Sequence, residues 1–323
     1  MASGPSWSPL RDRLARAHRR IALHFASIAQ TFFVGSARVG LVSVAMLAVG
    51  SPRLAASGLI VSVAARLCAV RFGVDQAFLE TGLVELNGWF LGLCCATFFS
   101  LDVGLLVALV LAGPLVAAMS IVMHRILAAW NLPLLIVPYL LSFWLLWAGF
   151  AAVPWAHPAM LPVPATHAAP ATVIVLAGLR GVGQIFFVPN ALLGAGIAVA
   201  VTLNDRRLGA AMVAASIAAV SLGYLAGAPD WQVQEGLAGF APALVAAAAL
   251  RRFVGLGRTA VVVAVVAGPF LEAGVLQASG AVGLPPLGAA YVGLVWMFAL
   301  VCRMRHGAAA RSAWSMGPRL FGD

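Results

Sequence analysis

The chain alternates long apolar runs with short polar or glycine-containing breaks, and most runs have the length of a helix that crosses a bilayer. In the first half, an apolar stretch over 21–50 has a polar break around residues 35–38. Four further spans are predicted near 53–71, 83–100, 102–123 and 133–152. The broken stretch predicts a half-membrane helix followed by a spanning one. The second half repeats this series near 172–188, 190–203, 208–227, 236–250, 259–278 and 284–302.

The two halves also repeat in sequence. Gln30-Thr31-Phe32-Phe33 returns 154 positions later as Gln184-Ile185-Phe186-Phe187. Further pairs keep that offset, or an offset of 152 toward the ends of the halves: Arg53 with Arg207, Gly82 with Gly236, Pro133 with Pro285, Tyr139 with Tyr291, and Trp144 with Trp296. Matches in one order with a single slip of two residues indicate an internal duplication.

Five spans is an odd number, so the second copy is expected to cross the bilayer in the opposite sense to the first. With both termini cytoplasmic, eight of the twenty arginines fall in cytoplasmic loops and nine in the two tails, as the positive-inside rule requires. The predicted parts are a basic cytoplasmic tail (1–20), the first inverted repeat (21–152), an uncharged extracytoplasmic linker (153–171), the second inverted repeat (172–302) and a second basic cytoplasmic tail (303–323).

Composition agrees with an integral protein of the plasma or bacterial inner membrane. Hydrophobic residues make up 63% of the 323 residues and charged residues only 9%. The net charge of +10 lies in loops and tails, which favours positive-inside topology over nucleic-acid binding. The four cysteines lie in apolar runs without metal-ligand spacing, and the six histidines form no catalytic pattern. The sequence therefore predicts no metal, no cofactor and no enzyme.

The broken stretches carry the candidate chemistry, and Gly35 and the pair Pro189 and Asn190 are expected to end the half-helices. A helix that ends within the bilayer leaves backbone groups without partners, which is tolerated only beside protein or a water-filled path. Gln30 and Gln184 add side-chain carbonyls at equivalent depths, so the breaks predict a row of acceptors for a neutral solute rich in N–H donors. The alternative for each glutamine is a hydrogen bond between helices. The neighbouring phenylalanines fit a pore wall and ordinary packing equally well.

Three patterns that each occur twice carry a resemblance to a known family. They are Q-x-x-F-x-x-N-P-x-T-G, G-L-x-G-[YF]-N-x-x-L and L-P-x-L-T-x-P-F, here in variant form. Over 21–302 the chain resembles the urea transporter family. The resemblance implies a homotrimer in which each protomer has ten spanning helices and two half-helices in inverted repeats. It also implies a central pore in which urea passes flat apolar slots lined by ladders of carbonyl oxygens.

The same resemblance assigns roles residue by residue. Gln30 and Gln184 match the oxygen-ladder positions, and the half-helix wall positions are Phe33, Ile185 and Phe187. The slot residues of the second half, Phe240 and Leu244, keep the family order. Those of the first half, Leu86 and Phe90, reverse it. Flat apolar walls suit urea because it is planar and neutral.

The chain departs from the family pattern at several positions. The central threonines are replaced by Ile136 and Gly288, and Ser36 and Ala37 replace the first Asn-Pro pair. Arg38 lies within the first predicted break, where it is expected at a pore mouth or paired with Glu85. The centre of the pore is therefore expected to be less polar than in the family.

The sequence predicts an all-α membrane protein that conducts urea, or a similar small neutral planar amide, down its gradient. The alternatives are a channel for another small neutral solute, such as ammonia or a short-chain amide, and an ion-coupled secondary transporter. Coupling requires an acid within the membrane. Glu272 is the best candidate, although its expected place near a helix end is more typical of a solvated interface residue.

Overall fold

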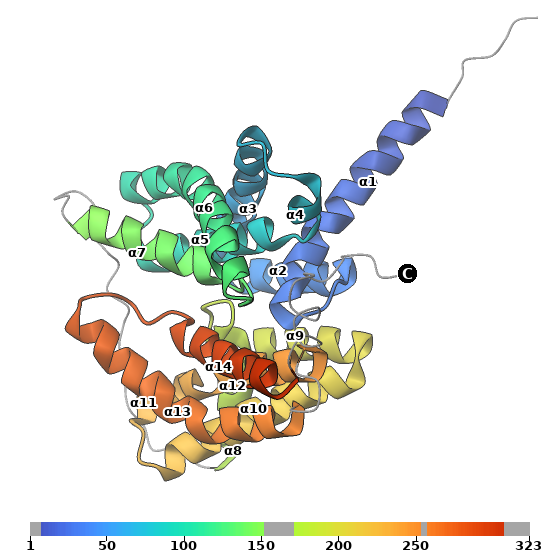
Figure 1. Cartoon of the computed structure of the whole chain (residues 1–323). Helices are drawn as coiled ribbons and strands as arrows, with labels where there is room; N and C mark the ends of the chain where they lie inside the picture. Colours follow the sequence, from blue (N-terminus) through green and yellow to red (C-terminus); the bar gives the residue numbers. More distant parts are fainter. Residues whose placement is uncertain (1–7, 152–170, 253–256, 307–323) are drawn as a thin grey trace, which may run out of the picture.

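A computed structural model describes residues 8–151, 171–252 and 257–306, and its regular elements are helices (Figure 1). The first series is α1 (Ser8–Ala29), the 3₁₀ turn η1 (Gln30–Phe32), α2 (Ala37–Gly50), α3 (Pro52–Arg71), α4 (Gln76–Glu80), α5 (Leu83–Phe98), α6 (Val103–Ala129) and α7 (Val137–Ala151). The second is α8 (Ala171–Gln184), α9 (Ala191–Asn204), α10 (Arg206–Leu225), α11 (Asp230–Glu235), α12 (Leu237–Arg252), α13 (Gly257–Ala281) and α14 (Ala289–His306).

The two series match helix by helix. Helices α2 and α9 both have 14 residues, α3 and α10 both have 20, and α5 and α12 both have 16. In Figure 1, α1–α7 occupy the upper part of the molecule and α8–α14 the lower part, with α2 and α9 side by side at the junction. The duplication in sequence is therefore a duplication in structure.

Backbone conformation repeats as closely as helix length. The described residues with positive φ form five equivalent pairs, at the offsets found in the sequence. The pairs are Phe33 and Phe187, Gly73 and Gly227, Gly82 and Gly236, Asn131 and Gly283, and Leu135 and Leu287. Left-handed backbone is uncommon outside glycine, so agreement at the two phenylalanines and two leucines is specific to a shared fold.

Reciprocal contacts relate the halves by a two-fold axis. The indole N–H of Trp144 donates to the carbonyl of Pro285 at 2.9 Å, and that of Trp296 donates to the carbonyl of Pro133 at 3.0 Å. Such exchanged contacts between equivalent residues are the mark of two-fold symmetry. The axis inverts the helices, because α5 ends and α12 begins at the same end of the molecule. Both of those helix ends lie beside the second break.

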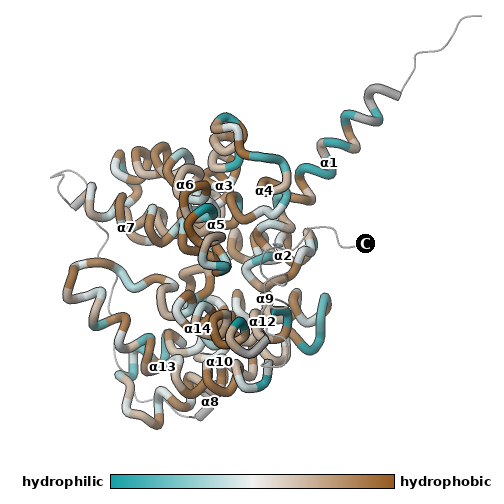
Figure 2. The backbone as a smooth tube through the Cα atoms, in the orientation of Figure 1, coloured by the Kyte–Doolittle hydropathy of each residue, from teal (hydrophilic) through white to brown (hydrophobic). Residues whose placement is uncertain are grey.

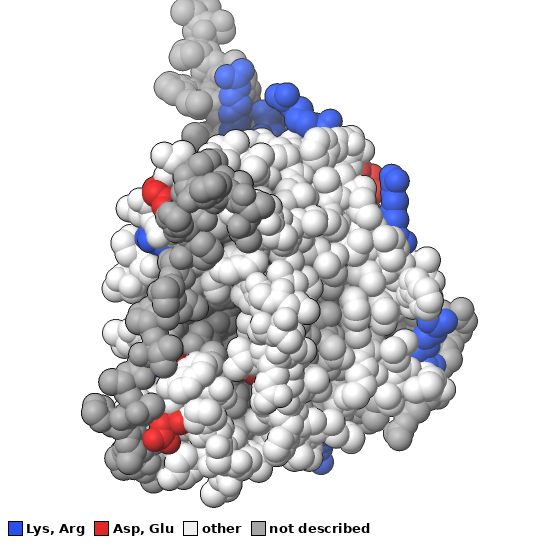
Figure 3. All heavy atoms as spheres, turned by 90° about the vertical axis from the view of Figure 1, so that its left-hand side faces the viewer, with Lys and Arg blue, Asp and Glu red and all other residues white. Residues whose placement is uncertain are grey.

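The outer surface is suited to a bilayer. Five described helices are long and apolar enough to cross a membrane: α3, α6, α10, α13, and α11 and α12 taken together as one span. Helices α1 and α2 form a bent pair, with an angle of 81° between them. Apolar residues dominate both halves in Figure 2, and Figure 3 shows charged residues mainly near the edges of one face. Helices α2 and α9 span only about 21 Å each, less than the hydrocarbon core of about 30 Å.

The structure confirms an all-α polytopic fold built from inverted repeats, and it refines the predicted boundaries. Helix α1 runs without a break from Ser8 through the predicted tail into the first repeat, and α14 continues to His306. The predicted linker, 153–171, falls outside the described residues except for Ala171. The positions of both termini relative to the membrane stay a prediction.

Candidate solute pathway

A cavity of about 950 Å³ lies between the halves, and it is lined from both of them. All eleven residues that the sequence selected line this one cavity: Gln30, Phe33, Leu86, Phe90, Ile136, Gln184, Ile185, Phe187, Phe240, Leu244 and Gly288. They come from the two breaks, from the facing helices α5 and α12, and from the segments that begin α7 and α14. Their contacts with a solute stay a prediction.

Each break is a Schellman turn that closes around a left-handed phenylalanine. In the first, the N–H of Phe33 donates to the carbonyl of Gln30 and the N–H of Val34 to that of Ala29, at 2.8 and 3.4 Å. Phe187 and Val188 repeat both hydrogen bonds in the second break. Glycine normally fills this position, because a side chain at positive φ is strained. Here the position carries a ring that lines the cavity.

The predicted helix terminators were therefore wrong. We expected Gly35 and the pair Pro189 and Asn190 to end the broken helices, but both helices end several residues earlier, at the Schellman turns. Residues after the turns instead start the next helix. The hydroxyl of Ser36 accepts from the N–H of Val39, and the side chain of Asn190 caps α9.

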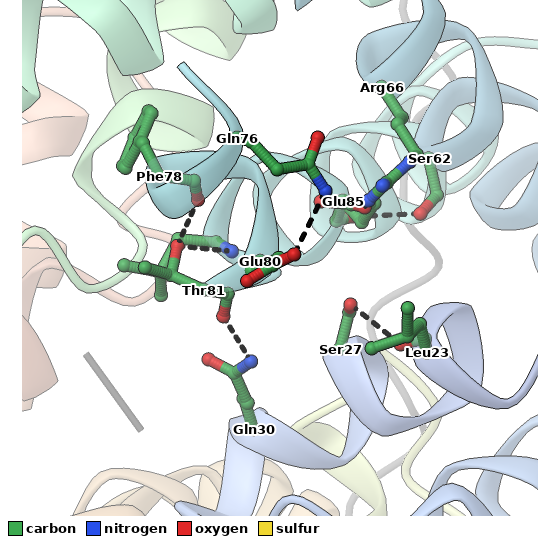
Figure 4. Close-up of polar contacts among 11 residues, drawn as sticks. Leu23, Ser27, Gln30, Ser62, Arg66, Gln76, Phe78, Glu80, Thr81 and Glu85 are labelled. Carbon is green, nitrogen blue, oxygen red and sulfur yellow. Dashed lines mark hydrogen bonds and ion pairs between the residues drawn. The ribbon is translucent and has the colours of Figure 1, made fainter. Parts of the chain in front are cut away.

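Gln30 is fixed with its amide oxygen free. Its Nε2 group donates to the backbone carbonyl of Thr81, which orients the carboxamide because a carbonyl can only accept (Figure 4). The approach requires Gly82, whose φ is +69° and where a Cβ would lie 2.8 Å from Nε2 of Gln30. Gln30 is 5% exposed, and its Oε1 atom has no hydrogen-bond partner among the described residues. A buried acceptor is thus left available in the cavity wall.

The second glutamine has a different partner and is more exposed than the first. Gln184 is half-buried, and its Nε2 group lies 3.4 Å from the carboxylate of Glu235, which occupies the position equivalent to Thr81. Arg180 of α8 donates to the backbone carbonyl of Gln234 at 2.9 Å and so holds α11 against α8. The two ends of the cavity are therefore equivalent in fold but unequal in charge.

Aromatic rings and leucines form the walls between these ends. The ring of Phe90 stacks on that of Tyr139, with centroids 5.3 Å apart and planes 22° apart. Phe186 contacts the rings of Phe32, Trp89 and Phe90 from behind, at 5.8–6.0 Å. These contacts fix the orientation of Phe90, since interiors pack without free space around large rings.

Ile136 and Gly288 meet across the two-fold axis. A Cβ on Gly288 would lie 2.7 Å from Cδ1 of Ile136 and 3.4 Å from the hydroxyl oxygen of Tyr139. Ile136 thus fills the space that a side chain at Gly288 would need. Asn87 holds this segment in place: its Nδ2 group donates to the carbonyl of Leu135 at 2.9 Å, and its Oδ1 accepts from the N–H of Tyr139 at 3.0 Å.

The expected pairing of Arg38 with Glu85 and the expected place of Glu272 near a helix end were wrong. Glu85 does not pair with Arg38, which is exposed in α2. It pairs with Arg66, whose own helix packs directly against α5. Glu272 does not lie near a helix end. It sits well inside α13 and lines the cavity, and its Oε2 atom is buried without a hydrogen-bond partner among the described residues.

Sequence reasoning also missed cavity residues that the repeat could have identified. Thr81 and Glu235 line the cavity at the 154-residue offset, and Tyr139 and Tyr291 line it at the 152-residue offset. The tyrosine pair served only as a marker of duplication. A search for polar residues at matching offsets would have selected all four.

Comparison with known families shows which class of membrane protein this fold and cavity belong to. A family model described as urea transporter matches residues 21–303. The chain belongs to the urea transporter family. This family membership gives it a role in urea transport across a membrane. A comparison with curated proteins gave no significant match.

Proposed function

We propose that this urea transporter family member is a passive channel, through which urea moves down its gradient along the cavity between the halves. The observation that carries the proposal is the buried, unpartnered Oε1 atom of Gln30 in the wall of a cavity that both halves line. Urea has four N–H donors and must lose water to enter a narrow path. A fixed acceptor at the entrance to the apolar section replaces part of that water.

The shape of the walls supports a planar, neutral solute. Leu86 and Phe90 from α5 face the cavity together with Phe240 and Leu244 from α12, so each half contributes one ring and one leucine. Apolar walls offer no compensation to an ion that leaves water, and several kcal/mol would be lost on its entry. A planar molecule fits between rings while its edges reach the acceptors at either end.

The arrangement of acids favours a passive channel over an ion-coupled transporter. Glu235 and Glu272 both line the cavity, but neither has an acid at the equivalent position of the first half. Thr81 corresponds to Glu235, and alignment of the shared prolines of α6 and α13 pairs Ala117 with Glu272. The two acids lie on different helices, and no cluster of three metal-binding side chains occurs in the described ranges. We propose transport without ion coupling and without a chemical step.

We further propose the assembly and topology that the resemblance implies, a homotrimer in the plasma or inner membrane with both termini cytoplasmic. The outer face of α13 is apolar and available for contacts with another protomer or with lipid, because Val262, Val266 and Phe270 are more than half exposed. Mass photometry in detergent and cysteine labelling from each side of a vesicle would test these two expectations.

The function is tested by stopped-flow light scattering on liposomes that contain the purified chain. An inward urea gradient should collapse faster than in empty liposomes, equally with and without sodium or a proton gradient. Gly288→Phe is the matched control, since its ring would occupy the space of Ile136 and close the path. Urea flux equal to that of empty liposomes refutes the proposal, and dependence on either ion gradient favours the coupled transporter.

A further inference from the structure

The centre of the cavity holds two tyrosines at equivalent positions. Tyr139 and Tyr291 are 2% and 3% exposed and both line the cavity. The chain has three tyrosines, and the remaining one, Tyr224, is 40% exposed at the end of α10, away from the cavity. A buried tyrosine hydroxyl usually has a hydrogen-bond partner, and the hydroxyl of Tyr139 interacts with the backbone of Gly288 in the other half.

The tyrosines replace family phenylalanines beside the missing threonines. The family pattern L-P-x-L-T-x-P-F corresponds to 132–139 and 284–291, where its threonine is Ile136 or Gly288 and its final phenylalanine is Tyr139 or Tyr291. Each half has thus lost one hydroxyl and gained another three residues later. Ile136 and Gly288 directly precede α7 and α14, and they line the same cavity as Tyr139 and Tyr291, so the new hydroxyls stay on the side of the cavity.

The hydroxyl of Tyr139 reaches across the two-fold axis. Its oxygen lies 3.4 Å from where a Cβ on Gly288 would stand, beside the point from which a threonine of the second half would project. Stacking on Phe90 fixes the ring, and Asn87 accepts from the N–H of Tyr139 and so fixes the backbone. The position of the Tyr139 hydroxyl is therefore fixed, next to the positions where the family pattern has threonine.

We propose that the hydroxyls of Tyr139 and Tyr291 are the central polar contacts of the pore and determine its preference for hydrogen-bonding solutes. A phenol both donates and accepts, so it can face either the carbonyl or an N–H of a planar amide. The proposal rests on the proposed urea channel and names the residues that provide selectivity at its centre.

The test uses Tyr139→Phe, Tyr291→Phe and the double variant in liposomes, with Tyr224→Phe as a matched control outside the cavity. Urea flux should fall about three- to tenfold for each cavity variant, as expected for one lost hydrogen bond. Tyr224→Phe should be unchanged. The ratio of urea flux to water flux should fall, because a plain packing defect would not lower the passage of urea selectively.

A rescue variant separates a hydroxyl effect from a structural one. Adding Ile136→Thr to Tyr139→Phe restores the threonine and phenylalanine of the family pattern, and it should recover most of the urea flux. If wild-type protein conducts urea while both tyrosine variants and the double variant do so equally well, the tyrosine assignment is overturned and the channel stands. Failure of rescue, with size-exclusion profiles unchanged, also overturns it. Absence of urea flux in the wild type overturns the channel and the tyrosine assignment together.

Discussion

Replacing Gln30 by leucine removes a buried side-chain acceptor that has no hydrogen-bond partner among the described residues. The variant keeps the side-chain volume close to that of glutamine and removes both the Oε1 acceptor and the hydrogen bond to the carbonyl of Thr81. A urea N–H at this point would have given up water without gaining a partner. An unsatisfied polar group of this kind costs about 1–3 kcal/mol, which raises the barrier and slows flux roughly five- to 150-fold.

The equivalent variant in the second half serves as an internal control. Gln184 is half-buried and interacts with a carboxylate at 3.4 Å, so water can replace its oxygen when Gln184→Leu is made. Its loss of flux should therefore be smaller than that of Gln30→Leu. The rates are measured by stopped-flow light scattering at equal protein density in the liposomes. Unchanged flux in Gln30→Leu, or a larger loss in Gln184→Leu, would contradict the assignment of Gln30 as the principal acceptor.

Three further variants test other parts of the structure. Gly40→Ala should lower the melting temperature in detergent, because its Cβ would lie 1.8 Å from a backbone oxygen of α1, whereas Gly50→Ala in the same helix has open space and should not. Arg66→Met leaves Glu85 buried without its cation and should cost about 3–5 kcal/mol of unfolding free energy, with most of the loss recovered when Glu85→Gln is added. Phe33→Gly should lower the melting temperature, because loss of a half-buried ring that packs against the core outweighs the relief of about 1 kcal/mol of left-handed strain. It should also lower the preference for urea over larger amides in the liposome assay.

The repeat explains why so much of the pathway could be predicted. Gln30 and Gln184 could be identified because each breaks an apolar run at a matching position, and the duplicated spacing extended the prediction to Leu86 and Phe240. Periodicity and composition constrain a membrane chain strongly, since every backbone group in lipid must be paired. Helix order and the two breaks followed from that constraint.

The remaining features depend on contacts that no local pattern encodes. The choice of Arg66 over Arg38 as partner of Glu85 follows from the packing of α3 against α5. The ends of the broken helices depend on a left-handed phenylalanine, although propensity favours glycine there. The place of the Tyr139 hydroxyl beside Gly288, on which its proposed role rests, depends on how the two halves pack.

The exchanged tryptophan hydrogen bonds set a limit on how the halves can move. Transporters that alternate access rock one repeat against the other around a fixed site. Trp144 and Trp296 each donate from one half to a proline carbonyl of the other, so rocking would break both bonds and separate the segments that begin α7 and α14. We therefore expect a passage open to both sides at once. Labelled urea should then leave loaded vesicles at the same rate whether or not unlabelled urea is present outside, since no carrier step exists to be accelerated by exchange.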